Sequence, residues 1–340
     1  MRAAVTTEAH GFEIVELPDP APGPDELVIR VAACGVCGSD VKAQPFMPAG
    51  IVMGHELGGE IVSVGSEAGN WRKGTNVAVL PVVCCGACSY CVAGAVAHCA
   101  QTRYIGMGSD RGGFAELAVV PARHAFALPD DLTGACAALV EPFAVGLHGV
   151  HTAEIRPGDE VLVVGAGGVG LTTIAWLSAK GAARITAADP DPERRKLASV
   201  MGATDVVGSV TECTAGAYDA AIECVGRPEL LQACQTVVRP LGRIVVSGAC
   251  AEAVPIEPVT ALLKELTIRF SVCYRPDEFR EVIAAFSRGD IEPARMMGPQ
   301  FGLDRIADAF DLVRNAGVHG RVLVTAGPTL QRHSSIRRAR

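Results

Sequence analysis

The stretch that decides the fold is Val161-Leu162-Val163-Val164-Gly165-Ala166-Gly167-Gly168-Val169-Gly170. Its first four residues are a continuous apolar run, typical of a strand buried on both faces of a parallel sheet. The glycines that follow, in a G-x-G-x-x-G pattern, permit a tight turn, a close backbone approach to a ligand and close packing of a helix on the strand. We therefore predict a strand ending at Val164 and a helix over residues 169–180.

A carboxylate follows at the place expected for a dinucleotide site. Asp189 directly follows the next predicted strand, residues 185–188. There it would accept from a ribose 2′-hydroxyl and repel a 2′-phosphate, which predicts NAD rather than NADP, with the pyrophosphate at the helix N-terminus. Arg194 and Arg195 either meet a 2′-phosphate or face the adenine or solvent. The predicted cofactor-binding residues are Gly165, Gly167, Gly168, Val169, Gly170, Asp189 and Arg194.

Strand and helix patterns alternate outward from this stretch, over about residues 144–275, which indicates a doubly wound parallel sheet and an α/β fold. The residues before it carry short alternating strands, such as 26–31, 59–64 and 76–80, separated by turn residues. After about residue 275 the patterns predict helices from Pro276 and from Leu303 and a last strand at 320–324, and we expect this segment to return to the N-terminal domain. Residues 328–340 are expected to form a flexible basic tail.

Bulk composition narrows the function classes. The chain has 340 residues, 49% of them hydrophobic, and a net charge of −7. Two domains are expected at this length, and the acidic balance argues against nucleic acid or an anionic membrane as partner. The N-terminus shows no signal peptide, so we expect a cytoplasmic protein whose thirteen cysteines are reduced. The uncharged stretch 161–179 contains four glycines and is interpreted as strand, turn and helix rather than a membrane span.

Four of the cysteines follow the spacing Cys85-x2-Cys88-x2-Cys91-x7-Cys99. Four thiolates on one loop can close a tetrahedron around zinc with no open position, which is the pattern of a structural site. Cys84 is interpreted as the spare residue of the adjacent pair, because the spacing of three selects Cys85.

A second, sparser set of ligands precedes this lobe. Cys37 and His55 lie in a β-rich region, and Glu141 interrupts an apolar run where a charge is costly unless it is paired or bound to metal. Three protein ligands and one open position are the pattern of a catalytic zinc. Glu141 could instead be a buried acid near the metal, with Glu56 or water as the ligand.

Together these motifs resemble the zinc-containing medium-chain dehydrogenases of the alcohol and polyol group, sorbitol- or threonine-dehydrogenase-like. The resemblance covers roughly residues 1–326, in order, through Cys-Gly-Val-Cys-Gly-Ser-Asp (34–40), Gly-His-Glu (54–56), the four-cysteine lobe, Glu-Pro (141–142), the glycine stretch and Glu-Cys-Val-Gly (223–226). It implies a GroES-like catalytic domain, residues 1–143 and 276–327, with an inserted Rossmann NAD-binding domain, residues 144–275.

The resemblance also implies residue roles. Cys37, His55 and Glu141 would hold catalytic zinc, and Glu56 would bind it directly or exchange with the bound oxygen. Ser39 would hydrogen-bond the substrate hydroxyl and begin a proton relay, while Asp40 would hold the far nitrogen of His55. Two zinc ions per chain, NAD and a homodimer or homotetramer are expected.

Two positions depart from relatives. Lys42 stands where many carry a relay histidine, so the outer end of the relay is left to a lysine or the cofactor ribose. Cys273, before Tyr274, stands where polyol dehydrogenases carry an arginine. We expect hydride transfer between a secondary alcohol or polyol and NAD, with threonine or an amino alcohol as the alternative substrate. A non-catalytic NAD-binding protein is the remote alternative.

Overall fold

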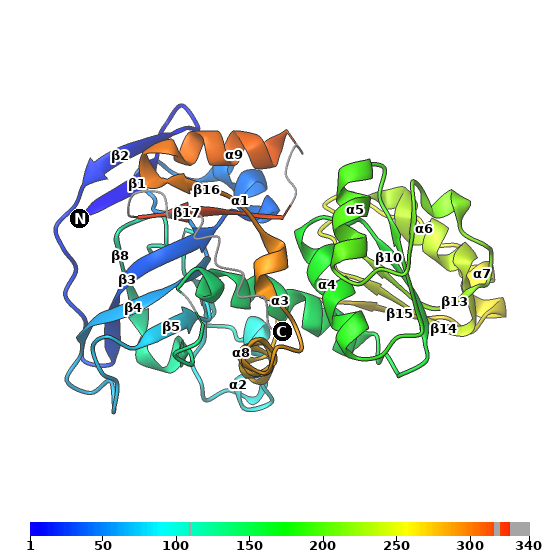
Figure 1. Cartoon of the computed structure of the whole chain (residues 1–340), viewed down its shortest axis with the longest axis horizontal. Coiled ribbons are helices and arrows are strands. Elements are labelled where there is room, and N and C mark those ends of the chain that lie inside the picture. The colour runs from blue at the N-terminus through cyan, green and yellow to red at the C-terminus, as the bar shows by residue number, and fades with distance from the viewer. Residues whose placement is uncertain (109, 133, 316–319, 327–340) are drawn as a thin grey trace, which may run out of the picture.

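The computed structural model describes residues 1–108, 110–132, 134–315 and 320–326. Figure 1 shows two lobes, a β-rich lobe that carries the N-terminus and a lobe in which helices surround a sheet. The predicted basic tail, residues 328–340, lies outside the described residues. The mixed α/β class predicted from the sequence is confirmed.

The glycine stretch belongs to a six-stranded parallel sheet of order β12-β11-β10-β13-β14-β15. Because the order reverses between β10 and β13, the carboxyl ends of these strands open a crevice at the point where such folds bind ligands. The strands are β10 (Glu160–Val164), β11 (Arg184–Ala188), β12 (Asp205–Val207), β13 (Tyr218–Glu223), β14 (Val238–Val246) and β15 (Thr267–Phe270).

Helices connect these parallel strands, as the alternating pattern predicts. Asp191 begins one of them, α5, by accepting hydrogen bonds from the backbone of Glu193 and Arg194, with Pro192 in the first turn. The helices of this lobe are α4 (Gly168–Ala179), α5 (Pro192–Val200), α6 (Pro228–Val237), α7 (Pro258–Leu263) and the 3-10 helix η4 (Val210–Glu212).

The other lobe is built on a seven-stranded sheet of order β16-β17-β3-β4-β5-β9, with β8 also paired to β3. The return of the C-terminal segment is observed here, since β17 pairs with β3 at Gly35 and Cys34. The strands of this lobe are β1 (Arg2–Thr6), β2 (Phe12–Glu16), β3 (Glu26–Gly35), β4 (Glu56–Val64), β5 (Asn76–Val79), β6 (Val82–Val83), β7 (Arg103–Tyr104), β8 (Leu117–Pro121), β9 (Ala125–Ala127), β16 (Met297–Gly302) and β17 (Arg321–Thr325).

Short helices cover the edges of this lobe. Those near the sites are α1 (Gly38–Ala43), α2 (Ser89–Val92) and α8 (Pro276–Arg288), the last of which ends at Gly289 in the left-handed conformation. The others are α9 (Ile306–Arg314), η1 (Gln44–Phe46), η2 (Val96–His98), η3 (Ala122–His124), η5 (Pro293–Met296) and η6 (Leu303–Arg305).

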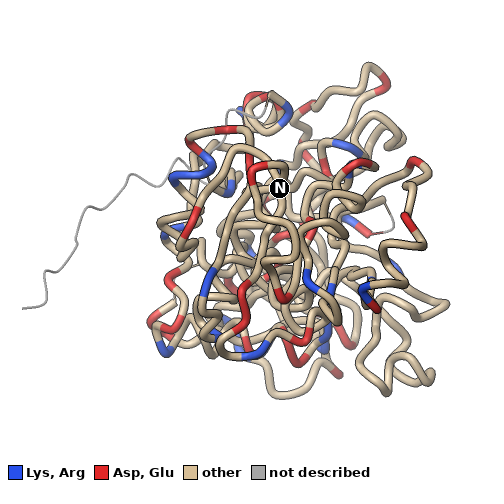
Figure 2. The backbone as a smooth tube through the Cα atoms, turned by 90° about the vertical axis from the view of Figure 1, so that its right-hand side faces the viewer, with Lys and Arg blue, Asp and Glu red and all other residues tan. Residues whose placement is uncertain are grey.

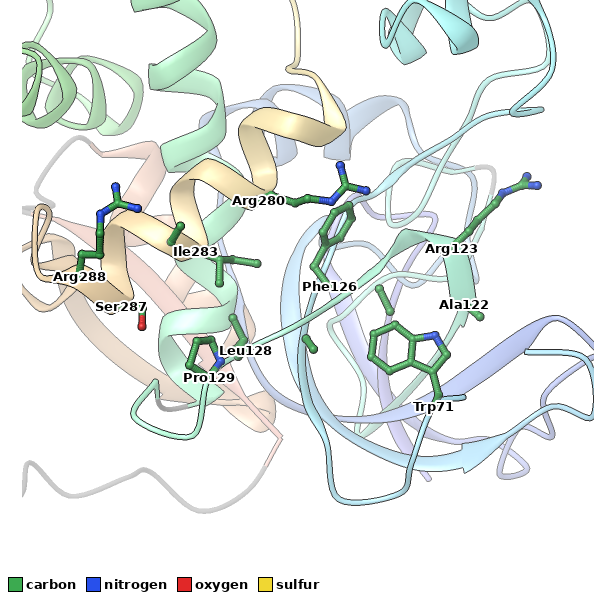
Figure 3. A pocket seen from close by; sticks show the side chains of 13 residues that line it. Trp71, Ala122, Arg123, Phe126, Leu128, Pro129, Arg280, Ile283, Ser287 and Arg288 are labelled. Atoms are coloured by element: carbon green, nitrogen blue, oxygen red, sulfur yellow. The ribbon is translucent and has the colours of Figure 1, made fainter. Parts of the chain in front are cut away.

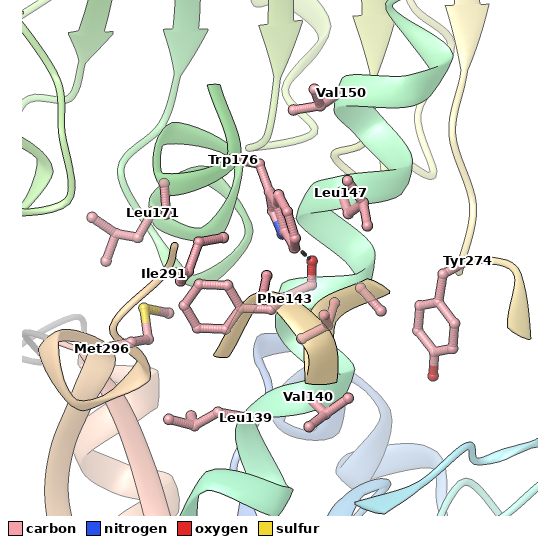
Figure 4. Close-up of a cluster of buried hydrophobic side chains, with 14 of the residues drawn as sticks. Leu139, Val140, Phe143, Leu147, Val150, Leu171, Trp176, Tyr274, Ile291 and Met296 are labelled. Atoms are coloured by element: carbon pink, nitrogen blue, oxygen red, sulfur yellow. Dashed lines mark hydrogen bonds between the residues drawn. The ribbon is translucent and has the colours of Figure 1, made fainter. Parts of the chain in front are cut away.

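One long helix, α3 (Gly134–Thr152), lies between the two lobes. The predicted domain boundary at residue 143 falls inside it, and the division into domains stays a prediction. A single hydrophobic core follows α3 from lobe to lobe. Figure 4 shows Phe143 and Leu147 of α3 beside Trp176 of α4, whose indole nitrogen donates to the Phe143 carbonyl at 2.8 Å.

Charge is distributed over the whole molecule. Figure 2 shows acidic and basic residues interspersed along the backbone, consistent with a net charge of only −7 over 340 residues. Within the described part of the chain, no helix combines the length and the apolar character needed to cross a bilayer.

Candidate active site

The cysteine predicted to hold the catalytic zinc lies between the end of β3 and the start of α1. Cys37 is the residue before α1, and its backbone nitrogen donates to the Asp40 carboxylate Oδ2 at 2.9 Å. Asp40 is fully buried. The first turn of α1 therefore fixes the thiol and the carboxylate relative to each other.

The other oxygen of Asp40 orients His55. The His55 Nδ1 donates to Asp40 Oδ1 at 3.0 Å, so the imidazole Nε2 is left as the ligand atom. Burial would lower the pKa of His55, but the charge and hydrogen bond of Asp40 outweigh burial and hold that pKa well above its usual range. Asp40 thus makes the imidazole electron-rich, which suits it to bind a cation.

Three ligand atoms converge beside this pair. Atoms of Cys37, His55 and Glu56 all lie within 4.8 Å of one another. Glu56 is fully buried, and neither of its carboxylate oxygens accepts a hydrogen bond among the described residues. Burial raises the pKa of this carboxyl, because a buried charge is costly, although the charge of Arg321 acts in the opposite direction. A thiolate, an imidazole and a carboxylate are ligands that zinc takes, so this group fits a catalytic zinc.

The four-cysteine lobe assembles as its spacing predicts. The ligand sulfurs of Cys85, Cys88, Cys91 and Cys99 all lie within 4.8 Å of one another, and Cys84 lies outside this group. Backbone N–H groups of Ala87 and Cys88 point at the Cys85 sulfur, each at 3.4 Å, and lower the pKa of this thiol to about 6. Because the loop favours the thiolate, it is suited to a fully coordinated zinc.

The glycine stretch opens a second kind of site. Gly165 follows β10 with φ 90°, and a Cβ on Gly170 would lie 1.8 Å from the Gly165 carbonyl oxygen, so both positions require glycine. A cavity of about 530 Å³ opens there. Four predicted residues line it, Gly165, Gly167, Asp189 and Arg194, together with Ser209, Val225, Arg227 and Leu230, which the sequence did not single out.

Asp189 is held in place at the edge of this cavity. Its carboxylate accepts from the backbone of Ala166 at 2.8 Å and of Asp191 at 2.9 Å, and Arg194 Nη1 lies 3.9 Å away. Each carboxylate oxygen can accept more than one hydrogen bond, so the acceptor needed for a ribose hydroxyl is available. Gly168, Val169 and Gly170 begin α4 and are not among the lining residues.

Two long stretches of the chain match known protein families. Residues 23–130 match the alcohol dehydrogenase GroES-like domain, and residues 168–288 match the zinc-binding dehydrogenase family. Sorbitol dehydrogenase of Bacillus subtilis is 30% identical over 92% of this chain and 93% of its own length. The chain belongs to the zinc-containing medium-chain dehydrogenases.

Two further relatives show that similar proteins differ in the substrate they are named for and in the cofactor they bind. L-threonine 3-dehydrogenase of Saccharopolyspora erythraea is 31% identical over 95% of this chain and 98% of its own length. A zinc-binding dehydrogenase of Sinorhizobium meliloti 1021, solved bound to NADP, superimposes with a TM-score of 0.89 at 32% identity, covering 95% of this chain and 98% of that one. Membership makes this chain a zinc-dependent, NAD(P)-dependent dehydrogenase acting on CH–OH groups.

The predicted third ligand of this medium-chain dehydrogenase, Glu141, lies near the tight group but outside it. It is buried on α3, and burial raises its pKa to about 7, although the charge of His55 acts in the opposite direction. The structure therefore brings Glu56, rather than Glu141, together with Cys37 and His55. Ser39 is exposed on the first turn of α1, next to the group.

Sequence reasoning missed Arg321. Its Nε lies 3.3 Å from Glu56 Oε2, and its guanidinium also borders Gly168 at the start of α4. A Cβ on Gly35 would lie 2.0 Å from the same Glu56 oxygen, so glycine there makes room for the carboxylate. The signal was present, since Arg321 is a charge at the start of the apolar last strand. One buried guanidinium, that of Arg321, thus contacts both the Cys37–His55–Glu56 group and the glycine stretch at the start of α4.

The two departures noted above lie at the site. Cys273 has a left-handed backbone with φ 54°, an uncommon conformation for a residue other than glycine. Burial and the charge of Glu141 raise the pKa of its thiol to about 11, although the charge of His55 acts in the opposite direction. Lys42 is exposed on α1, and its charge reaches Glu223 at the end of β13, in the other lobe, where it opposes the effect of burial on the pKa of that carboxyl.

Proposed function

We propose that this chain oxidises a secondary alcohol or a polyol with NAD, using zinc held by Cys37, His55 and a glutamate. The observation that carries the proposal is the fully buried Glu56 carboxylate, which accepts no hydrogen bond from the described residues and lies against a thiol and an imidazole. The cavity at the glycine stretch supplies the cofactor site in the same molecule.

The chain's own residues would prepare the metal site. When bound, zinc supplies a Lewis acid that lowers the pKa of the substrate hydroxyl. Asp40 keeps the His55 Nδ1 protonated and so presents Nε2 to the site. Arg321 balances the charge of Glu56 when the carboxylate is not engaged. Glu56 and Glu141 are the two candidates for the third ligand, and the closer grouping of Glu56 favours it.

Proton transfer would begin at Ser39. This residue is exposed on the first turn of α1, two positions after Cys37, so its hydroxyl can reach a substrate oxygen and still contact water. Lys42 lies one turn further along the helix and offers an outer acceptor or donor at the position where relatives use histidine.

The cofactor would lie over the carboxyl ends of β10, β11 and β13. When bound, NAD takes the hydride from the alcohol carbon. Asp189 would accept from the adenosine ribose, while Arg194, which approaches that carboxylate, lies where a 2′-phosphate would be. We propose NAD as the preferred cofactor because two backbone N–H groups fix the Asp189 carboxylate, whereas the contact that holds the Arg194 guanidinium among the described residues is a loose 3.9 Å ion pair with that carboxylate.

A substrate screen with cofactor reduction as the readout tests this function. Polyols, simple secondary alcohols, threonine and aminocyclitols are each offered with NAD and with NADP. Turnover of an alcohol or polyol with NAD is expected. Turnover of threonine alone would replace the first substrate class by the amino-alcohol class, which the similarity to threonine dehydrogenases favours. Cofactor binding without turnover on any substrate would contradict the proposal.

Metal analysis tests the zinc assignment separately. We propose a second, structural zinc at Cys85, Cys88, Cys91 and Cys99, so about two zinc ions per chain are expected. One or none in protein purified without chelators would contradict it.

We also propose that the chain is a homodimer or homotetramer. The edge strand β15 and the preceding helix α7 expose large apolar side chains, including Phe270 at 70% and Leu263 at 76%. An exposed edge strand with apolar side chains is prone to pair with another chain. Sedimentation of the wild-type chain and of Phe270→Glu tests this, since the variant is expected to shift toward the monomer.

A further inference from the structure

A groove outside the catalytic region lies between helix α8 and the edge strand β9. Its volume is about 790 Å³, within the range of small-molecule sites. Figure 3 shows Arg280 close to Phe126, with Trp71 and Arg123 to one side and Leu128, Pro129 and Ile283 to the other. We call this the arginine groove; its lining also includes Ala122, Ala125, Ala127, Ala284, Ser287 and Arg288.

The charges of the arginine groove have one sign. Three arginines line it and no aspartate or glutamate does. Arg288 is neutralised by Asp290 at 2.6 Å, but no described carboxylate lies within ion-pair distance of Arg280 or Arg123. Arg123 donates instead to the Cys84 carbonyl oxygen at 2.5 Å. Arg280 is therefore an uncompensated guanidinium at the groove, and Arg123 adds a second positive charge at its edge, in a chain of net charge −7.

The same groove offers flat apolar surface. The Arg280 guanidinium lies over the Phe126 ring, 5.2 Å from its centre. This contact keeps the planar cation at the apolar wall while its N–H groups remain available to an anion. Trp71, on the opposite side, adds a second large ring.

We propose that the arginine groove binds an amphipathic organic anion, with an aromatic or aliphatic body between Trp71, Phe126 and Ile283 and a carboxylate, sulfonate or phosphate on Arg280. Apolar walls with a few convergent polar groups are the composition of small-ligand sites. A planar guanidinium recognises such anions through two parallel hydrogen bonds. This site is separate from the cavity at the glycine stretch and shares no lining residue with it.

The probe for the test is 8-anilinonaphthalene-1-sulfonate, an aromatic anion that becomes fluorescent when it leaves water. The zinc-loaded enzyme is titrated with saturating NAD present, so that the cofactor cavity is blocked. The chain has two tryptophans. Trp71 lines the groove, whereas Trp176 lies in the buried core. The part of the energy transfer that is lost in Trp71→Phe therefore comes from Trp71 and reports a probe bound close to the groove.

Three variants decide the outcome. Arg280→Glu is expected to weaken probe binding at least tenfold, and Trp71→Phe to remove most of the energy transfer. Arg305→Glu is the matched control, since the Arg305 guanidinium lies over the Phe301 ring at the same 5.2 Å but lines none of the cavities described. The affinity of Arg305→Glu for the probe should match that of wild type. Circular dichroism checks that the exposed substitutions leave the fold intact.

Two results would overturn the proposal. One is equal probe affinity for wild type, Arg280→Glu and Arg305→Glu with NAD saturating. The other is a change of sedimentation coefficient in Arg280→Glu without a change in probe affinity, because this would assign the groove to a second copy of the chain. Arg280→Lys keeps the positive charge but loses the planar guanidinium. Its affinity for the probe is therefore expected to lie between those of wild type and Arg280→Glu.

Discussion

The four-cysteine lobe and the Cys37–His55–Glu56 group differ in where their ligands come from. The lobe takes all its ligands from residues 85–99, and three of the four cysteines are half-exposed. The other group combines the residue before α1 with the two residues that precede or begin β4, and its imidazole and carboxylate are buried. The lobe can form locally, whereas the buried group needs the sheet, α1 and Arg321 in place. We infer that the first site serves the fold and the second depends on it.

Cys37→Ala should produce the largest effect, confined to activity. Removal of a ligand from the buried group is expected to lower kcat/KM on the order of a thousandfold, which corresponds to about 4 kcal/mol. Steady-state kinetics measure the loss of kcat/KM. Thermal melting of the same preparation measures stability, and the melting temperature should stay near that of wild type. A large loss of stability would contradict the separation of the two sites.

Cys85→Ser should show the reverse pattern. Loss of the structural zinc is expected to cost about 3 kcal/mol and to lower the melting temperature by roughly 6–12 °C. The kcat/KM of the folded fraction should remain within about threefold of wild type. Cys84→Ser is the matched control, because Cys84 lies beside Cys85 but outside the ligand group. Equal destabilisation by both variants would remove the distinction between the two cysteines.

Asp40→Asn tests how the buried group depends on its neighbours. Substitution of a residue that orients a metal-bound histidine typically costs about 10–100-fold in metal affinity or activity. Both kcat and the retention of zinc against a chelator should decrease. The reason is that an asparagine amide can donate to an unprotonated Nδ1 of His55, which would leave the proton on Nε2, the expected ligand atom. Unchanged zinc retention would show that His55 is oriented by other contacts.

Glu278→Gln should give the smallest effect, at a contact outside both sites. Burial raises the pKa of Glu278, but His148 and His151, which donate at 2.9 and 2.8 Å, lower it to about 2. A carboxyl whose pKa is lower in the folded than in the unfolded state stabilises the folded protein at pH values above the unfolded pKa. This stabilisation is lost as the pH falls toward 2. The variant should lose about 1 kcal/mol at neutral pH.

Acid unfolding measures this last effect. The stability gap between wild type and Glu278→Gln should be full above about pH 5 and narrow as pH falls below about 4, where the unfolded carboxyl gains its proton. Asp277→Asn is the control, since Asp277 lies on the same helix, is 70% exposed and pairs with Arg275 rather than with either histidine. A gap that stays constant with pH would show that Glu278 contributes through packing rather than charge.

The local parts of both sites could be predicted from the sequence, because short-range spacing determines them. Residues 85–99 specify the lobe by themselves, and the strand, turn and helix around Gly165 follow from glycine placement. The helix that carries Glu141 was not predicted, since Pro142 and several glycines obscure its periodicity. Arg321 reaches Glu56 only because β17 returns to β3. The return was expected and the charge at the start of the last strand was visible, but no local pattern indicates which distant side chain such a return brings beside it.

Pro142 gives helix α3 a mechanical property. A proline inside a helix cannot donate its backbone hydrogen bond, so the rod is weakest at that turn. Glu141 is the adjacent residue, and the lobes lie on either side. Any rotation of one lobe against the other that bends this rod would swing the Glu141 carboxylate toward or away from His55. Cofactor binding, if it rotates the lobes, and the coordination of the metal would then both depend on the bend of α3 at Pro142.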